Sequence, residues 1–234
     1  MLKLIRLEWK KNNIVKYICG VAVLALLLCL FLFALAFLGI AEEPDGTLDA
    51  AEGMNMISAP VELFTSMSFL IFTSVMLASF LVSPYKNKTM NLMFSYPIKR
   101  QKILVAQMAA VWLFNFFALL VTKLLIYACI SAGAKTMRSS FEIDVDMGSL
   151  SFYVSLLTKT VVIVSMSFIA LFVGLAVKSS KATIITSFLL IFLTQANVGD
   201  VSLAGNAAVP VILTVVSFLF AGLSVCRVET RDLP

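Results

Sequence analysis

Residues 17–41 read YICGVAVLALLLCLFLFALAFLGIA, a run without a single charged side chain. A bilayer core about 30 Å thick is crossed by about 20 apolar residues in an α-helix, so this run predicts a membrane span. The run follows a basic segment, as the apolar core of a secretory signal does, but such a core is only about 7 to 15 residues long. We therefore interpret residues 17–41 as a retained membrane anchor.

Five more apolar stretches follow, and the whole chain is 61% hydrophobic but only 13% charged, which is not a soluble composition. The expected spans are 17–41, 60–83, 103–131, 152–177, 182–198 and 207–226. Gln195 and Asn197 close the fifth span early, and either a re-entrant turn before Pro210 or an ordinary loop fits that region. The predicted fold is an all-α integral membrane protein with six transmembrane helices in one domain, residues 1–234.

Lysine and arginine are divided unevenly between the two sides of these spans. Basic residues in short loops resist translocation, so the richer side is expected to be cytoplasmic. Only Lys135 and Arg138 lie on the poorer side. Fourteen lie on the richer side: Lys3, Arg6, Lys10, Lys11, Lys16, Lys86, Lys88, Lys99, Arg100, Lys102, Lys178, Lys181, Arg227 and Arg231. Both termini and residues 84–102 are therefore predicted to be cytoplasmic, and residues 42–59 and 132–151 to be extracellular loops.

The net charge of +5 reflects this division between the two faces. It indicates no nucleic-acid partner, and the basic inner face favours anionic membrane lipid. The basic segment 1–16 places Leu2, Ile5 and Trp9 on one side of a helix. We expect this segment to be an interfacial helix on the inner membrane surface, with Trp9 at the depth of the lipid headgroups.

Several kinds of catalytic site are excluded by the composition. The chain has no histidine, which removes the usual general base, the usual metal ligand and every Ser-His triad. Its four cysteines, Cys19, Cys29, Cys129 and Cys226, form no C-x-x-C pair and are interpreted as small buried apolar residues. No G-x-x-x-x-G-K-[ST] phosphate loop occurs. We expect no enzymatic activity, metal site or cofactor in this chain itself, and we expect its polar residues to be concentrated in the loops.

The cytoplasmic loop 84–102 contains the stretch KTMNLMFSYPIKRQK at residues 88–102. Met90, Met93 and Phe94 are spaced i, i+3 and i+4, which places them on one side of a short helix. Such an apolar stripe on a basic helix fits either the headgroup region of the membrane or a hydrophobic groove on a cytoplasmic partner. Methionine suits the second alternative because its flexible side chain adapts to an irregular surface.

This stretch resembles the segment between the second and third spans of ABC-2-type transporter permeases. Lys88 and Asn91 stand where that family frequently has glycine and an acidic residue. The residues that follow the family's order are Thr89, Met93, Phe94, Pro97, Lys99 and Arg100. The Y-P-I-K-R string is similar to a subgroup found in Gram-positive bacteria beside small ATPases and linked to bacitracin or lantibiotic resistance.

The resemblance implies a permease subunit in the bacterial cell membrane, with a coupling helix between helices 2 and 3. It implies two kinds of partner, an ABC-type ATPase that binds ATP and Mg²⁺ and a second permease chain, identical or sibling. The exported substrate would be a peptide, a lipid-linked compound or another amphiphile. Two other classes stay open, a stand-alone channel or secondary carrier and a membrane sensor without transport.

Lys123 and Lys159 are the ionisable residues that lie well inside the predicted spans. Each lies eight positions from an expected outer end, or about 12 Å at 1.5 Å per residue. Glu62, at the outer start of the second span, is a possible partner for either lysine. One interpretation is an outer cavity that receives a lipid phosphate or acidic group; the other is that the helices project beyond the membrane or the lysines snorkel. These three residues, with Gln195 and Asn197, are the candidate translocation path.

Overall fold

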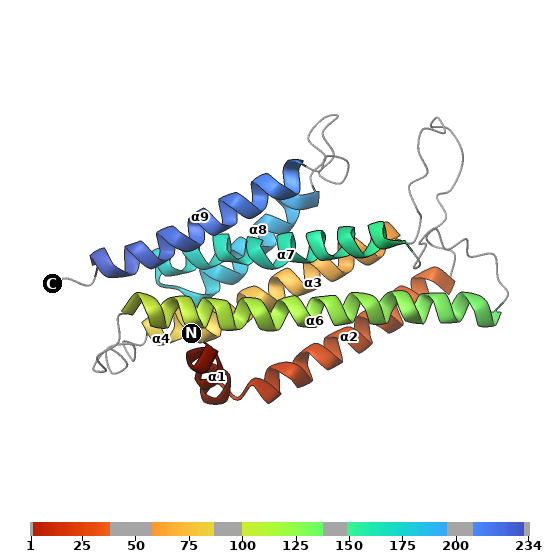
Figure 1. Cartoon of the computed structure of the whole chain (residues 1–234), viewed down its shortest axis with the longest axis horizontal. Coiled ribbons are helices and arrows are strands. Elements are labelled where there is room, and N and C mark those ends of the chain that lie inside the picture. Colours follow the sequence, from red (N-terminus) through yellow and green to blue (C-terminus); the bar gives the residue numbers. More distant parts are fainter. Residues whose placement is uncertain (1, 38–57, 87–99, 138–148, 196–207, 232–234) are drawn as a thin grey trace.

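The computed structural model describes residues 2–37, 58–86, 100–137, 149–195 and 208–231, and this part of the chain is all-helical (Figure 1). Its helices are α1 (Leu2–Lys11), α2 (Ile14–Phe37), α3 (Ser58–Leu77), the π-helical turn η1 (Ala78–Val82), α4 (Ser83–Lys86), α6 (Arg100–Met137), α7 (Leu150–Val177), α8 (Ser180–Gln195) and α9 (Ala208–Arg231). Each of the six predicted apolar stretches falls largely on a helix. The predicted all-α membrane class is therefore confirmed.

Four of the described helical stretches are long and apolar enough to cross a membrane. They are Ile14–Leu35, Pro60–Val82, Gln101–Gly133 and Leu150–Val177. The apolar stretches Ser180–Phe192 and Val211–Val225 are shorter. Since a straight crossing takes about 20 residues, the fifth and sixth predicted spans do not reach this length within the described residues.

Helices α3, α6 and α7 enclose most of the core. One buried cluster surrounds Phe69, Leu119 and Val164, and the next surrounds Met76, Leu81 and Leu171. In Figure 1, α8 and α9 lie along α7, while α2 lies along the edge of the bundle beside α6. We call the end of the bundle where α7 begins the Leu150 end, and the end where α6 begins the Arg100 end. Two long helices, α6 and α7, connect the two ends.

Helices α2 and α6 approach each other closely near the Leu150 end and separate toward the Arg100 end (Figure 1). Gly133 lies at this close approach, where a Cβ atom would force the ring of Phe33 to move. Asn13, with φ 48°, separates α1 from α2 and lets the chain turn there. Helix α1 then fits against the Arg100 half of α6.

The predicted N-terminal helix exists, and its apolar face contacts α6; its expected place at the inner membrane surface stays a prediction. Ile5 and Glu8 are buried. The indole N–H of Trp9 donates to the carbonyl oxygen of Ala110 over 3.1 Å, and Gln107 Nε2 donates to Glu8 Oε1 over 3.2 Å. The physical reason is that a buried amide in α6 needs a polar partner, which Glu8 supplies.

The two long helices correct the predicted loop 132–151. Helix α6 continues to Met137 and α7 already begins at Leu150, so helix occupies both ends of that range. At 38 residues α6 is about 57 Å long, far more than one bilayer core. Hydropathy could not locate the end of α6 at Met137, because a helix can continue past the apolar residues that define a membrane span.

The start of the loop 84–102 is held against the bundle. The second predicted span ends in η1, where Ser83 N–H donates to the carbonyl of Ala78, and Pro84 follows directly. Proline has no backbone N–H to donate, and its ring clashes with the helical turn that precedes it. The wider π-helical turn next to Pro84 avoids this clash. Tyr17 of α2 donates its hydroxyl to Ser79 Oγ over 3.0 Å and packs edge-on against Phe80. The loop thus leaves from a point that is anchored to α2.

Candidate functional site

Three helices bring Glu62, Lys123 and Lys159 together, and we call these residues the ion cluster. Glu62 lies in the first turns of α3, Lys123 in the middle of α6 and Lys159 in the first half of α7. Lys123 Nζ lies 2.7 Å from Glu62 Oε2, and Lys159 Nζ lies 3.8 Å from Glu62 Oε1. The expected pairing of Glu62 with the lysines is confirmed, and one carboxylate serves both.

The two lysines differ in their exposure. The side chain of Lys123 is 0% exposed, whereas that of Lys159 is 50% exposed, with Glu62 between them at 21%. Removing an ammonium group from water is very unfavourable unless a counter-charge and hydrogen bonds replace the water. The snorkelling alternative is therefore wrong for Lys123, which is held by Glu62 inside the protein.

The surroundings of the ion cluster are mostly apolar. Val61, Ile126 and Leu156 are buried and lie within three positions of its members in sequence. Tyr127, one turn beyond Lys123, is also buried and packs edge-on against Phe152 of α7, with ring centroids 5.1 Å apart. Electrostatic attraction is stronger in such a medium than in water, so the Glu62–Lys123 pair ties α3 to α6.

Polar side chains also extend through the core, which corrects the expectation that they are concentrated in the loops. In α6, Gln107 and Asn115 are fully buried, like Lys123. Asn115 Nδ2 donates to the carbonyl of Val111 over 2.9 Å and approaches the sulfur of Met76 at 3.4 Å. Sequence reasoning missed Gln107 and Asn115, although two amides inside an apolar stretch of this length were a visible signal.

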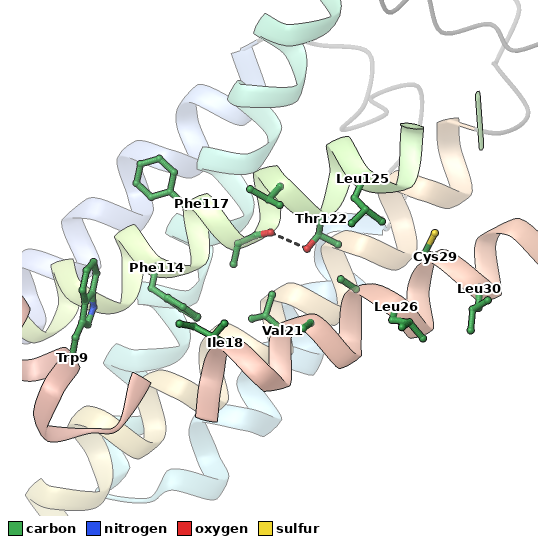
Figure 2. Close-up of a pocket in the computed structure, with 14 residues that line it drawn as sticks. Trp9, Ile18, Val21, Leu26, Cys29, Leu30, Phe114, Phe117, Thr122 and Leu125 are labelled. Carbon is green, nitrogen blue, oxygen red and sulfur yellow. Dashed lines mark hydrogen bonds between the residues drawn. The ribbon is translucent and has the colours of Figure 1, made fainter. Parts of the chain in front are cut away.

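An apolar groove of about 700 Å³ runs between α2 and α6 (Figure 2). Ile18 and Leu26 of α2 and Phe114 and Phe117 of α6 line it, and Trp9 lies at one end. The hydroxyl of Thr122 in its wall already donates to the carbonyl of Ala118 over 2.8 Å, as the dashed line shows. The groove therefore suits apolar groups such as acyl chains.

The groove and the ion cluster lie on opposite sides of α6. Lys123 follows Phe114 by nine positions, and at about 100° per residue this is half a turn around the helix axis. Phe114 lines the groove, whereas Lys123 points toward α3 and α7. A ligand in the groove does not reach the ion cluster through α6.

The other predicted site residues lie at or beyond the described helices. Arg100 begins α6 and Gln195 ends α8. Asn197 and the proposed coupling residues Thr89, Met90, Met93, Phe94, Pro97 and Lys99 lie outside the described residues. Their predicted roles stay predictions.

The chain is similar over its whole length to the uncharacterized protein YcbO of Bacillus subtilis (strain 168). The two are 24% identical over 240 residues, which cover 99% of this chain and 100% of that protein. No family model matches the chain, and no solved structure matches it. The name of this relative describes no activity.

Proposed function

We propose that the chain is the membrane-spanning subunit of an ATP-driven exporter in the bacterial cell membrane. It has six spans and cytoplasmic termini, and it pairs with a second permease chain and a separate ABC-type ATPase. ATP and Mg²⁺ bind to the ATPase, and this chain catalyses no reaction itself. The division of basic residues between the loops and the resemblance of residues 88–102 to ABC-2-type permeases support the proposal.

The observation that carries the proposal is the continuous course of α6. This helix begins at Arg100, the last of the residues that match the permease pattern, and carries Lys123 in the buried ion cluster. At 1.5 Å per residue the two positions are about 35 Å apart along one helix. A change in the cytoplasmic loop thus has a direct route to charged groups deep in the bundle.

In this arrangement the Arg100 end faces the cytoplasm and the Leu150 end faces outward. The loop 84–102 supplies the contact with the ATPase, through the stripe of Met90, Met93 and Phe94. To drive transport, that contact must differ in free energy between the two states of the ATPase, because an equal contact shifts no equilibrium. Lys99 and Arg100 stand where the resulting movement enters α6.

The candidate path at the outward end consists of the ion cluster together with Gln195 and Asn197. Its charges favour a substrate with a polar or anionic group, and the apolar helix surfaces around it favour an amphiphile. A peptide, a lipid-linked compound or another amphiphilic molecule fits this description. The proposal includes a role in resistance to antimicrobial peptides, as in the subgroup that the loop resembles.

The proposal is tested by purifying the tagged chain from its native membrane in mild detergent. We expect a P-loop ATPase to co-purify in a fixed ratio, identified by mass spectrometry and by ATP hydrolysis. The double variant Met93→Asp plus Phe94→Asp is expected to insert normally and to lose this ATPase, because two charges disrupt the apolar stripe. Asn91→Asp plus Ser95→Asp adds the same two charges on the other side of a helix and is expected to retain it.

Two results would contradict the proposal. One is recovery of the wild-type chain without any ATPase, which favours a self-contained channel or carrier. The other is a Met93→Asp plus Phe94→Asp complex that keeps both ATPase association and substrate-stimulated turnover.

A further inference from the structure

A polar stripe runs along the exposed side of α7 to the ion cluster. Ser151, Ser155, Thr158 and Lys159 are exposed and are spaced i, i+4, i+7 and i+8. At about 100° per residue this spacing places them within an arc of about 100° on one side of the helix. A lysine on a membrane helix faces water, a ligand or protein, since lipid hydrocarbon offers its ammonium group no partner.

Lys159 has unused hydrogen-bonding capacity at the end of this stripe. Its Nζ lies 3.8 Å from Glu62, beyond the range of about 2.7 to 3.2 Å for an N–H···O bond. An ammonium group has three donors, and half of the Lys159 side chain is exposed. Lys123, by contrast, is fully buried and directly hydrogen-bonded to Glu62. Lys159 is therefore the member of the ion cluster that can bind a ligand.

The charges of the ion cluster are unequal. Two ammonium groups share one carboxylate, which leaves a formal charge of +1 in an apolar part of the bundle. Lys159 lies nine positions from Leu150, or about 14 Å from the start of α7. At this depth the dielectric constant is lower than in water. An anion therefore attracts the unbalanced positive charge more strongly here than it would in water.

Two hydroxyl groups lie beside Lys159 on the same face. Ser155 Oγ donates to the carbonyl of Phe152, and Thr158 Oγ1 donates to the carbonyl of Val154, each over 2.8 Å. A hydroxyl can rotate away from such a local bond and donate to a stronger acceptor. Together with the Lys159 ammonium group they form a set of donors that suits the oxygen atoms of a phosphate or carboxylate.

We propose that Lys159, Ser155 and Thr158 bind the anionic headgroup, a phosphate or carboxylate, of an amphiphile at the Leu150 end of the bundle. Lys123 holds the carboxylate of Glu62 in place on one side of Lys159. The proposed ligand binds on the other, exposed side. A role of this amphiphile as the exported substrate rests on the proposed exporter function, whereas its binding by the chain does not.

Binding is measured on the purified chain alone, in detergent micelles, by native mass spectrometry. The probes are phosphatidylglycerol, phosphatidylcholine with the same acyl chains, and inorganic phosphate as a competitor. We expect phosphatidylglycerol to bind at least tenfold more tightly than phosphatidylcholine. Lys159→Gln is expected to abolish that difference, and Lys159→Arg to retain it, because only the first removes the charge.

Lys181→Gln is the matched control, since it removes one exposed positive charge at the Arg100 end of the bundle. It is expected to leave the preference for phosphatidylglycerol unchanged. If millimolar inorganic phosphate displaces the lipid, the site recognises the phosphate group itself. If the lipid resists displacement, the site recognises the headgroup together with its acyl chains. Both results support the proposal. Equal binding of the two lipids by the wild-type chain, or wild-type preference in Lys159→Gln, would overturn it.

The assay separates this site from the exporter function because no ATPase is present. If the chain binds phosphatidylglycerol through Lys159 but recruits no ATPase, the headgroup site is supported and the exporter function is contradicted. If the chain recruits the ATPase but shows no lipid preference, the exporter function is supported and the headgroup site is contradicted.

Discussion

At the scale of single residues, the Glu62–Lys123 pair holds a buried charge that neither residue can hold alone. Lys123 is fully buried, and its ammonium group lies 2.7 Å from the carboxylate. Removing one member of a buried ion pair typically costs about 3 to 5 kcal/mol, whereas replacing both with apolar or neutral groups is often nearly neutral. The stability of the bundle should therefore depend on the pair as a unit.

We predict that Glu62→Gln lowers the free energy of unfolding by about 3 kcal/mol, because it leaves Lys123 buried without a counter-charge. The double variant Glu62→Gln plus Lys123→Met is expected to recover most of that loss. Lys159→Gln serves as the control and should change stability by less than about 1 kcal/mol, since its side chain is half exposed. Equilibrium unfolding in detergent measures all three variants, and a double variant that is no more stable than Glu62→Gln alone would contradict the prediction.

Much of the ion cluster could be predicted from the sequence. Lys123 and Lys159 stand out because charges are rare in apolar spans, and Glu62 at the outer start of the second span was a possible partner for either. What the sequence did not reveal is which lysine is buried. That depends on the faces of α6 and α7 that meet α3, and hydropathy alone does not determine those faces.

At the scale of helices, α1 is attached to α6 by side chains that lie about a hundred positions apart in sequence. Two hydrogen bonds, from Trp9 to Ala110 and from Gln107 to Glu8, make this attachment. The amphipathic pattern predicted the helix but not the surface that it covers. A lipid headgroup and a neighbouring helix both satisfy an apolar stripe with a tryptophan, so the pattern alone did not reveal the contact with Gln107.

We predict that Glu8→Ala plus Trp9→Phe releases α1 and speeds tryptic cleavage after Lys10 or Lys11 roughly 30-fold. Each lost hydrogen bond is worth about 1 kcal/mol, and cleavage requires local opening of the helix. Mass spectrometry of the cleaved peptides measures the rate at this site. Leu7→Ala should leave the rate unchanged, because Leu7 is 61% exposed. Equal rates in the double variant and the wild-type chain would show that these two bonds do not hold α1.

The approach of α2 to α6 can be tested with native cysteines. The thiols of Cys29 on α2 and Cys129 on α6 are free, and the two side chains lie close enough to interact. We predict that mild oxidation by copper phenanthroline joins them in a disulfide, with the oxidant accepting two electrons and two protons released. Peptide mass spectrometry should detect this cross-link, while Cys19, which is exposed on α2, should stay open to alkylation. A chain in which Cys129 remains fully alkylated after oxidation would contradict the observed approach of α2 to α6.

At the scale of the whole molecule, the sequence predicted the order of the apolar helices in the described part of the chain but not their lengths. An apolar run locates a membrane helix because only apolar side chains are stable in lipid. The ends of α6 and α7 contain both polar and apolar residues, so hydropathy does not show where these helices end. The turn between α7 and α8 depends on a different feature. Lys178 takes a left-handed conformation with φ 55°, and Gly174 lets Thr183 of α8 come close. A lysine in that conformation is not apparent from composition.

The predicted orientation of the whole bundle is open to labelling with a membrane-impermeant maleimide. In a cysteine-free background we expect Asp45→Cys to be labelled in intact cells and Lys88→Cys only after the membrane is made permeable. The reason is the concentration of basic residues on the Lys88 side of the spans. Labelling of Lys88→Cys in intact cells would reverse the assignment of the two faces.

The attachment of α1 near Gln107 has a mechanical consequence for α6. Gln107 lies seven positions from Arg100 and sixteen from Lys123, or about 10 Å and 24 Å along the helix. If α6 tilts as a rigid rod about this attachment, α1 acts as a fulcrum and the two arms have a ratio of roughly 1 to 2. A push of about 1 Å at Arg100 then swings Lys123 by about 2 Å in the opposite direction, and a shift of that size is enough to break a hydrogen bond of the kind that Lys123 makes with Glu62.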